Sequence, residues 1–283
     1  MKQFSAISAI SEYLQTEKAK GVTIGFVPTM GALHEGHLNL VRRSAKENQL
    51  TVCSIFVNPT QFNNPDDLDK YPRTLHQDIK MLKSAGCDVV FTPGTSEMYP
   101  EKEILPLAIE FGMLDKVMEG KFRPGHFKGV CLVVKKLFDI VQPARAYFGK
   151  KDFQQLAVIR FMVEKLAVPV EIIPCETVRE TDGLAMSSRN MRLTIAEREI
   201  APTIYKVLLK VREKVGKLPV IELKEWAVKK IQENKELRVE YFEIGDKESL
   251  MPIEKWLHKD RAVAFVAVFL GDVRLIDNIE LFS

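Results

Sequence analysis

Hydrophobic and polar positions follow two alternating patterns over the first 176 residues. Short runs rich in Val, Ile and Phe, without strict alternation, predict strands buried on both faces of a parallel sheet, and apolar residues spaced three or four apart between them predict helices. Repeated strand–helix units of this kind predict an α/β fold, a Rossmann-like doubly wound parallel sheet. The predicted strands cover 22–27, 51–57, 88–92, 144–148 and 170–174, and the predicted helices cover 38–47, 75–85, 130–141 and 153–166, after a first helix with Ile7, Ile10 and Leu14 on one face.

The pattern changes after about residue 176. Helices are predicted at 194–215 and 221–234, followed by strands at 238–244, 262–269 and 273–276. Alternation within the first and last of these strands is typical of a sheet with one solvated face. The sequence therefore predicts two domains, a Rossmann-like domain at 1–176 and a second, smaller α+β domain at 177–283. A ligand cleft is expected at their polar junction, residues 175–189.

Composition and charge narrow the class of protein. The formal net charge of +3 is too small to favour a nucleic-acid or membrane partner, and it suits small anionic ligands equally well. We expect no signal peptide, because the first residues lack a basic segment followed by an apolar core. No apolar run approaches the roughly 18–20 residues of a membrane helix. The four cysteines form no C-x-x-C pair, so we expect free, buried thiols in a cytoplasmic protein.

The segment 28–37, Pro-Thr-Met-Gly-Ala-Leu-His-Glu-Gly-His, carries the clearest chemistry. It joins a predicted buried strand to a predicted helix through a Gly-bearing turn. Such a turn binds phosphate in α/β proteins, because main-chain N–H groups and the positive end of the helix point at it. The imidazoles of His34 and His37 can donate hydrogen bonds to a polyphosphate, and Gly36 lets a ligand approach between them.

Two other interpretations of this histidine pair stay open. The two residues can be polar positions at the start of a helix that bind nothing. They can also be zinc ligands, although a spacing of three lacks the i, i+4 arrangement of His-Glu-x-x-His and the remaining histidines are not at ligand-like spacing.

Further polar segments lie where a parallel sheet binds its ligands, beyond the carboxyl ends of strands. Asn58 and Gln61 follow one predicted strand and can donate to and accept from a hydroxyl or a carboxylate. Lys151 follows another strand and can reach a phosphate, while Gln155, one turn into the next helix, would face the same crevice as Gln61. Alone, each of these segments is also compatible with an ordinary turn or helix cap.

Two loops complete the set of candidates. Arg123 lies in the loop Arg-Pro-Gly-His-Phe, which offers one fixed cation. The segment 186–190, Met-Ser-Ser-Arg-Asn, places two hydroxyls and a guanidinium in a row, a compact set of donors for triphosphate oxygens. The alternatives are an exposed turn for the first loop and a Ser-rich linker for the second.

The motifs together resemble a known family. His-x-Gly-His after a strand is similar to the motif of the nucleotidylyltransferase and class I aminoacyl-tRNA synthetase superfamily, which transfers an adenylyl group from ATP. Taken in order, the segments resemble the pantoate–β-alanine ligase (pantothenate synthetase) family. The match runs from residue 27 to about 190 and rests on 28–37, 56–62, 71–73, 148–155 and 182–190.

The resemblance implies ATP-dependent ligation of D-pantoate and β-alanine to pantothenate, through a pantoyl adenylate, with release of AMP and pyrophosphate. It implies ATP as a substrate, Mg²⁺ bridging the phosphates mostly through water, a nucleotide- and pantoate-binding first domain and a second domain that closes as a lid. It also implies a cytoplasmic homodimer whose partners are small-molecule substrates, with no nucleic acid and no membrane.

The resemblance also assigns residues. His34, His37 and Lys151 are the expected catalytic residues, and Asp78 is an expected outer ligand of Mg²⁺. Pantoate and β-alanine are expected to bind Pro28, Thr29, Met30, Asn58, Gln61, Arg123 and Gln155. ATP is expected to bind Met30, Gly31, Ala32, Leu33, His34, Glu35, Gly36, His37, Gly149, Lys150, Lys151, Asp152, Val178, Met186, Ser187, Ser188 and Arg189, with the Gly-bearing turn supplying main-chain donors.

Three rival functions share parts of this pattern. A nucleotidylyltransferase that adds AMP to a phosphate-bearing substrate would have a turn like that of residues 28–37, which we name the histidine turn. Class I tRNA charging fits less well, because no additional tRNA-binding module and no strongly basic face is evident in the sequence. A non-enzymatic nucleotide sensor would bind ATP without turning it over.

Overall fold

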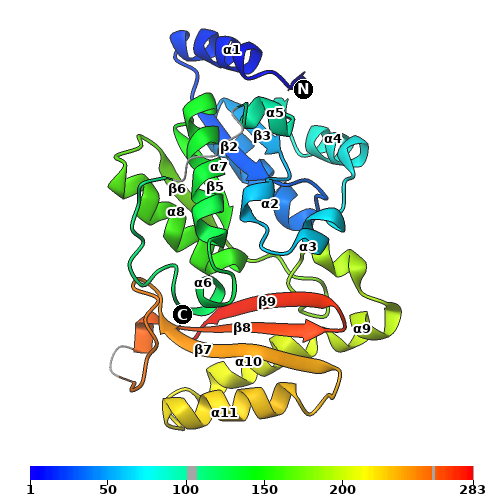
Figure 1. Cartoon of the computed structure of the whole chain (residues 1–283), viewed down its shortest axis with the longest axis vertical. Coiled ribbons are helices and arrows are strands. Elements are labelled where there is room, and N and C mark those ends of the chain that lie inside the picture. The colour runs from blue at the N-terminus through cyan, green and yellow to red at the C-terminus, as the bar shows by residue number, and fades with distance from the viewer. Residues whose placement is uncertain (101–106, 257–258, 283) are drawn as a thin grey trace. The chain divides into compact units, whose positions relative to one another are not determined.

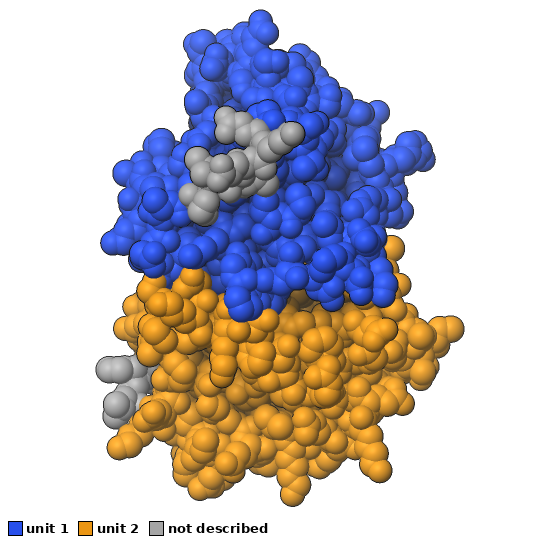
Figure 2. All heavy atoms as spheres, in the orientation of Figure 1, with its two compact units in different colours: residues 1–111, 123–150, 155–176 blue, residues 112–122, 151–154, 177–283 orange. Residues whose placement is uncertain are grey.

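The computed structural model describes residues 1–100, 107–256 and 259–282. Two compact units can be distinguished in the chain (Figure 2). Unit 1 comprises residues 1–111, 123–150 and 155–176, and unit 2 comprises 112–122, 151–154 and 177–283. Two short segments of unit 2, 112–122 and 151–154, thus lie before the single boundary predicted at residue 176.

A parallel sheet forms the centre of unit 1. Within the described residues it has six strands in the order β1-β4-β3-β2-β5-β6. Figure 1 labels β2, β3, β5 and β6 of this sheet. β2, β3 and β4 are buried along nearly their whole length, because helices flank the sheet. The predicted Rossmann-like α/β sheet is confirmed. Its strands are β1 (Lys2–Phe4), β2 (Ile24–Thr29), β3 (Leu50–Ile55), β4 (Val89–Phe91), β5 (Arg145–Gly149) and β6 (Glu171–Cys175).

Amphipathic helices cover this sheet. The helix α2 packs on β2 and β5, and α7 packs on β2 and on α1. Val41 of α2 and Leu82 of α4 meet Val27 and Cys53 of the sheet in one apolar core. The helices are α1 (Ile7–Ala19), α2 (Glu35–Glu47), α3 (Pro65–Asp69), α4 (Leu75–Ser84), α5 (Thr95–Met98), α7 (His126–Val141) and α8 (Phe153–Lys165), and the 3₁₀ turns are η1 (Pro59–Gln61) and η2 (Lys150–Asp152).

The strand order reverses next to β2. The chain moves from β2 through β3 to β4 in one direction, whereas β5, on the other side of β2, is followed by β6 in the opposite direction. In open α/β sheets the crevice beyond the carboxyl ends of the strands at such a reversal binds ligands. The segment 28–37 therefore begins at the position where this topology favours a ligand.

The edge strand β1 was not predicted. Its three residues pair in parallel with β4, from Lys2 opposite Val89 to Phe4 opposite Phe91. The strand is short and mostly exposed, so it has no apolar run that a pattern search could detect.

Unit 2 contains an antiparallel sheet covered by helices, as predicted for the C-terminal part. Within the described residues the sheet has three strands in the order β7-β8-β9, with α11 packed on β7 and α10 packed on α11 and β9. Leu208, Leu223, Val266 and Leu275 belong to its apolar core. The elements are α6 (Met118–Phe122), η3 (Ser188–Arg192), α9 (Ile195–Ile200), α10 (Thr203–Lys214), α11 (Val220–Ile231), β7 (Leu237–Asp246), η4 (Lys259–Arg261), β8 (Ala262–Leu270) and β9 (Val273–Glu280).

Two predictions for this unit need correction. The single helix predicted at 194–215 is two helices, α9 and α10, because Pro202 lacks an N–H and restricts the residue before it. The last strand was predicted to end at residue 276 but continues to Glu280. The polar residues Asp277 and Asn278 interrupt the alternation, yet both are buried in the strand.

The segment 112–122, which belongs to unit 2, is held to the rest of that unit by polar contacts. Gln154 accepts a hydrogen bond from the Glu119 N–H (3.0 Å) and donates to the carbonyl oxygens of Leu114 (2.7 Å) and Val117 (2.9 Å). Arg274 of β9 forms a bidentate pair with the Glu119 carboxylate, at 2.9 and 2.7 Å. The partners of these groups are far away in the sequence, which is why periodicity could not reveal them.

Among the helices that the structure describes, none has the length and apolar content needed to span a bilayer.

We expect Gly129→Ala to destabilise unit 1. Gly129 lies in α7 where the helix meets η1, and an added Cβ would overlap the Thr60 carbonyl group. The overlap should cost about 1–3 kcal/mol, which outweighs the gain of up to ~1 kcal/mol from replacing Gly by Ala in a helix. Urea unfolding monitored by circular dichroism measures the change.

Gly94→Ala is the matched control, because a Cβ there meets only ordinary contacts and Gly94 has a negative φ. Its unfolding free energy should stay within about 0.5 kcal/mol of the parent. A Gly129→Ala variant as stable as the parent would contradict the close approach of α7 and η1.

Candidate functional site

The two histidines lie side by side at the start of α2. His34 is the N-cap residue of this helix and His37 is its third residue, so their ring centroids are 4.1 Å apart. The main-chain N–H of His34 donates to Nδ1 of His37 at 3.4 Å. A ring nitrogen that accepts a hydrogen bond carries no proton, so neutral His37 has its proton on Nε2. This nitrogen is therefore the one that can donate to a ligand.

The buried carboxylate of Asp78, on α4, holds the turn that precedes these histidines. Asp78 is 1% exposed. Its Oδ2 accepts from the Ala32 N–H (3.0 Å), and its Oδ1 accepts from the Leu33 N–H (2.9 Å) and from the Thr74 hydroxyl (3.1 Å). The N–H of Gly31 donates to the Thr29 hydroxyl at 3.3 Å.

These contacts concern two of the expected roles. The N–H groups of Gly31, Ala32 and Leu33 donate to side-chain oxygens within the protein, and their expected donation to a phosphate stays a prediction. The Asp78 carboxylate accepts from three donors and so positions the turn, and its expected role as an outer Mg²⁺ ligand stays a prediction. Among the described residues, no group of three or more His, Cys, Asp or Glu side chains could hold a metal ion.

Asn58 is hydrogen-bonded to the neighbouring loop. It is 1% exposed. Its Nδ2 donates to Gln61 Oε1 and to the Gly129 carbonyl, both at 3.2 Å. Its Oδ1 accepts from the hydroxyl of Tyr99 at 2.9 Å and from the N–H and hydroxyl of Thr60. Through the bond to Oε1, Asn58 orients the Gln61 amide; its expected contact with a substrate stays a prediction.

Gln61 joins this loop to the histidine turn and to Arg123. Its Nε2 lies 3.1 Å from the sulfur of Met30. Its main-chain carbonyl accepts from Nδ1 of His126 at 2.8 Å, and Nε2 of His126 faces Nη1 of Arg123 at 3.1 Å. Because a carbonyl oxygen only accepts, the His126 proton is on Nδ1, and Nε2 accepts from the guanidinium. The structure thus links Met30, Gln61 and Arg123, the last through His126; that they bind a substrate stays a prediction.

Sequence reasoning missed His126 and Tyr99 as parts of this arrangement. His126 was considered only as a histidine without ligand-like spacing, and Tyr99 was not considered. Both act on groups more than 40 positions away, since Tyr99 contacts Asn58 and His126 contacts Gln61. A histidine inside the Arg-Pro-Gly-His-Phe loop was the only available signal.

The residues that follow β5 are divided between the units. Gly149 ends β5, and Lys150 forms an ion pair with the exposed Glu176 at 2.6 Å. Lys151 and Asp152 belong to unit 2, whereas Gln155 belongs to unit 1 and is half-buried on α8. The neighbouring Gln154, rather than Gln155, is the buried glutamine, and it serves the segment 112–122.

In unit 2 the segment 178–190 folds back on itself. The Met186 N–H donates to the Val178 carbonyl at 3.0 Å, and Gly183, with φ +93°, forms the tip of the hairpin. Ser187 then caps η3, because its hydroxyl accepts from the Arg189 N–H at 3.3 Å. We name residues 178–190 the serine hairpin. It presents Ser187, the buried Ser188 and the half-buried Arg189 in sequence.

The candidate residues therefore form one group in each unit. Pro28 and Thr29 of unit 1 continue β2 instead of forming a turn. The other candidate residues of unit 1 are those of the histidine turn, Gln61, Arg123, Gly149, Lys150 and Gln155. Unit 2 holds Lys151, Asp152 and the serine hairpin. That both groups bind one ligand is a prediction.

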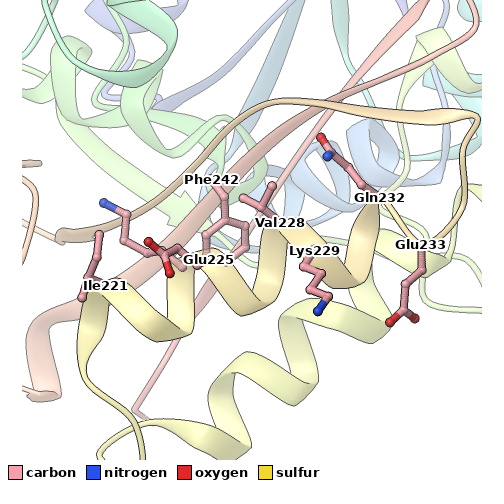
Figure 3. Close-up of a pocket in the computed structure, with 8 residues that line it drawn as sticks. Ile221, Glu225, Val228, Lys229, Gln232, Glu233 and Phe242 are labelled. Carbon is pink, nitrogen blue, oxygen red and sulfur yellow. The ribbon is translucent and has the colours of Figure 1, made fainter.

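A surface pocket of about 720 Å³ lies elsewhere in unit 2. One face of α11, the residues Gln232 and Glu233 that follow it, and Phe242 of β7 line the pocket (Figure 3). Lys and Glu side chains alternate around its apolar floor, and it contains none of the candidate residues.

The fold and the histidine turn at the strand reversal define a doubly wound α/β protein of the Rossmann-like class. The family model for pantoate–β-alanine ligase matches residues 2–280. Pantothenate synthetase from Bacteroides fragilis is 50% identical over 280 residues, covering 99% of both chains, and that from Porphyromonas gingivalis is 47% identical over the same coverage. The chain belongs to the pantoate–β-alanine ligase family.

Solved structures agree with this family. The pantothenate synthetase of Thermus thermophilus is similar with a TM-score of 0.93 and 44% identity over 100% of both chains. The ligase of Francisella tularensis, solved with β-γ ATP and β-alanine, is similar with a TM-score of 0.84 and 36% identity, covering 99% of this chain and 98% of that one.

We expect Asp78→Asn to loosen the histidine turn. The amide places an NH₂ group opposite one of the two main-chain N–H groups, so at least one buried donor loses its acceptor. The unfolding free energy should fall by about 1–3 kcal/mol. Amide hydrogen exchange at Ala32 and Leu33 should accelerate, which mass spectrometry of peptides from residues 28–37 detects.

Asp139→Asn serves as the control, because Asp139 pairs with Lys135 on an exposed helix surface. Surface pairs of this kind contribute at most about 1 kcal/mol. Unchanged amide exchange at residues 32 and 33 in Asp78→Asn would show that the Asp78 carboxylate does not hold this turn.

Proposed function

We propose that the protein catalyses the ATP-dependent ligation of D-pantoate and β-alanine to pantothenate, with release of AMP and pyrophosphate, through a pantoyl-adenylate intermediate. The observation that carries the proposal is the pair of adjacent imidazoles at the strand reversal of a chain that matches the family along its whole length. The Francisella tularensis relative, solved with β-γ ATP and β-alanine, supports the choice of substrates.

In the first step a carboxylate oxygen of pantoate attacks the α-phosphorus of ATP. A bond forms between that oxygen and phosphorus, and the bond to the bridging oxygen breaks, so pyrophosphate leaves. Negative charge builds up on the phosphate oxygens, and preorganised donors stabilise it. We assign Nε2–H of His37, the His34 imidazole and the ammonium of Lys151 to this role, with Ser187, Ser188 and Arg189 as further donors.

In the second step the amine of β-alanine attacks the acyl carbon of the adenylate. The carbon–nitrogen bond forms, the bond to the AMP oxygen breaks, and the amine loses a proton to the solvent or to a phosphate oxygen of AMP. Activation is needed because a free carboxylate has no good leaving group. Acyl adenylates hydrolyse readily, so we also propose that the second domain closes as a lid that excludes water.

Pantoate is proposed to bind next to Met30, Gln61 and Gln155, with Pro28, Thr29 and Arg123 nearby. Holding the carboxylate in line with the α-phosphorus removes much of the entropic barrier to attack. The support is the contact between Met30 and Gln61 and the chain of bonds from Arg123 through His126 to the Gln61 carbonyl. Asn58 contributes by orienting Gln61.

The remaining parts of the proposal follow from the family resemblance. Mg²⁺ would accompany ATP and be bound mostly through water, with Asp78 as its expected outer ligand. The protein would act as a cytoplasmic homodimer on small molecules, without a nucleic-acid or membrane partner.

We expect pyrophosphate–ATP exchange when protein, ATP-Mg and pantoate are mixed without an amine. Pantoyl adenylate formation is reversible, so labelled pyrophosphate should enter ATP only when pantoate is present. Adding β-alanine should then yield AMP and pantothenate in equal amounts. His37→Ala should lower the single-turnover rate of adenylate formation by about 10²–10³, the effect of losing one preorganised donor.

His76→Ala is the matched control, since this histidine lies exposed on α4. A change of less than threefold in His37→Ala would remove His37 from the chemistry. Binding of ATP without any exchange would identify a nucleotide sensor, and adenylyl transfer only to a phosphate-bearing substrate would identify a nucleotidylyltransferase.

We expect Gln61→Ala to raise the KM for pantoate more than the KM for ATP, because the lost amide is assigned to the pantoate pocket. Steady-state kinetics with each substrate varied in turn give both constants. Equal increases in the two constants would contradict the assignment.

A further inference from the structure

A polar pair lies buried in the last strand of unit 2. Asp277 and Asn278 belong to β9 and are 5% and 7% exposed. The next residue, Ile279, belongs to the apolar core of the unit. Burying a carboxylate and an amide is unfavourable unless their polar atoms are satisfied, so their partners indicate what the pair does.

Asp277 holds the serine hairpin through Arg179. The guanidinium donates to Oδ2 of Asp277 from Nη1 at 2.7 Å and to Oδ1 from Nη2 at 2.9 Å. The same two nitrogens donate to the carbonyl oxygens of Gly183 and Asn278, each at 3.2 Å. The guanidinium also lies over the ring of Tyr205, 3.7 Å from its centroid. The bidentate pair fixes both the position and the orientation of Arg179.

Asn278 holds Lys151, the other residue of unit 2 that is proposed to donate to ATP. Its Nδ2 donates to the main-chain carbonyl of Lys151 at 2.8 Å. Its own N–H donates to Oδ1 of Asp277 at 2.8 Å, so the two side chains form one arrangement. Phe153, two residues after Lys151, packs edge-on against Phe265 of β8 at 5.5 Å. The turn that carries Lys151 is therefore anchored to the sheet of unit 2.

Two consecutive residues thus bind two segments that are 28 positions apart, at Lys151 and at Arg179. We propose that Asp277 and Asn278 are positioning residues, which fix Lys151 and the serine hairpin relative to each other so that both reach the same triphosphate. This inference rests on the proposed function, because that function assigns Lys151 and Ser187–Arg189 to ATP. Neither residue of the pair is expected to touch ATP itself.

The inference is tested with Asp277→Asn, Asn278→Ala and Arg179→Lys. Each change breaks at least one hydrogen bond of the arrangement, and Arg179→Lys retains the charge while losing the bidentate geometry. The affinity for ATP-Mg alone is measured by isothermal titration calorimetry. We expect the Kd to rise by about tenfold to a hundredfold, because small misplacements of donors weaken their combined action strongly. In the ligation assay, the KM for ATP should rise while the KM for pantoate stays within about twofold.

Asp246→Asn is the matched control. Asp246 forms the same kind of bidentate pair with Arg261, at 2.7 and 2.8 Å, but on β7 and without contact to a candidate residue. It should lower the stability of the unit without changing the Kd for ATP. Circular dichroism establishes that each variant is folded, and Arg179→Lys keeps the test decisive if one of the β9 variants does not fold.

The outcomes separate this inference from the proposed function. Folded variants that bind ATP as tightly as the parent overturn the inference, even if pantothenate is formed. A parent that binds ATP without forming pantothenate overturns the proposed function, while weaker ATP binding by the variants still supports the positioning role. Weakened ATP binding in the Asp246→Asn control would also overturn the inference, since it would show a general effect of destabilisation.

Discussion

The Asp78 carboxylate and the two main-chain N–H groups that it binds form the interaction on which the site in unit 1 depends. Gly31 and Ala32 both have positive φ, at 80° and 49°, a conformation that is unfavourable for a residue with a side chain. Hydrogen bonds to an ionised carboxylate are stronger than neutral ones and offset this strain. Because the turn ends at His34, the hydrogen bonds to Asp78 also determine where α2 begins.

Space around this turn explains its glycine. A Cβ on Gly31 would lie 3.0 Å from a methyl carbon of Ile55 and 3.1 Å from Oδ2 of Asp78, in addition to the unfavourable φ. The same carboxylate therefore binds the turn and limits which residues can form it. The position of the Asp78 carboxylate therefore determines the hydrogen bonds that hold the turn, the need for glycine at position 31 and the placement of the two imidazoles.

Much of the fold was predictable because it depends on local pattern. Continuous apolar runs identified the buried strands, and helical spacing identified α2, α4, α7 and α8. The failures have physical reasons: β1 has too few residues to show a pattern, Pro202 divides a helix whose apolar spacing continues across it, and buried polar residues conceal the end of β9. The adjacency of His34 and His37 was also predictable, since it depends only on a helix start.

The hydrogen-bond partners of Asn58, of Asp78 and of the main-chain N–H groups in the turn could not be predicted from local pattern. A sequence shows which residues can donate or accept, but it does not show which distant group already occupies them. Asp78 is 45 and 46 positions from its main-chain donors, and Asn58 is 71 positions from Gly129. The polar partners in β9 lie even further from Lys151, so residues that support a site are harder to recognise than those that line it.

The pairing of Glu119 with Arg274 has a consequence for the order in which the chain can assemble. The two residues are 155 positions apart, and Glu119 is buried with Arg274, Glu240 and the hydroxyl of Tyr241. During synthesis on the ribosome, the strands β1 to β6 and the segment 112–122 emerge before β7, β8 and β9. Glu119 therefore cannot be paired with Arg274 until β9 has been synthesised. A chain that stops before β9 would leave that carboxylate without its guanidinium.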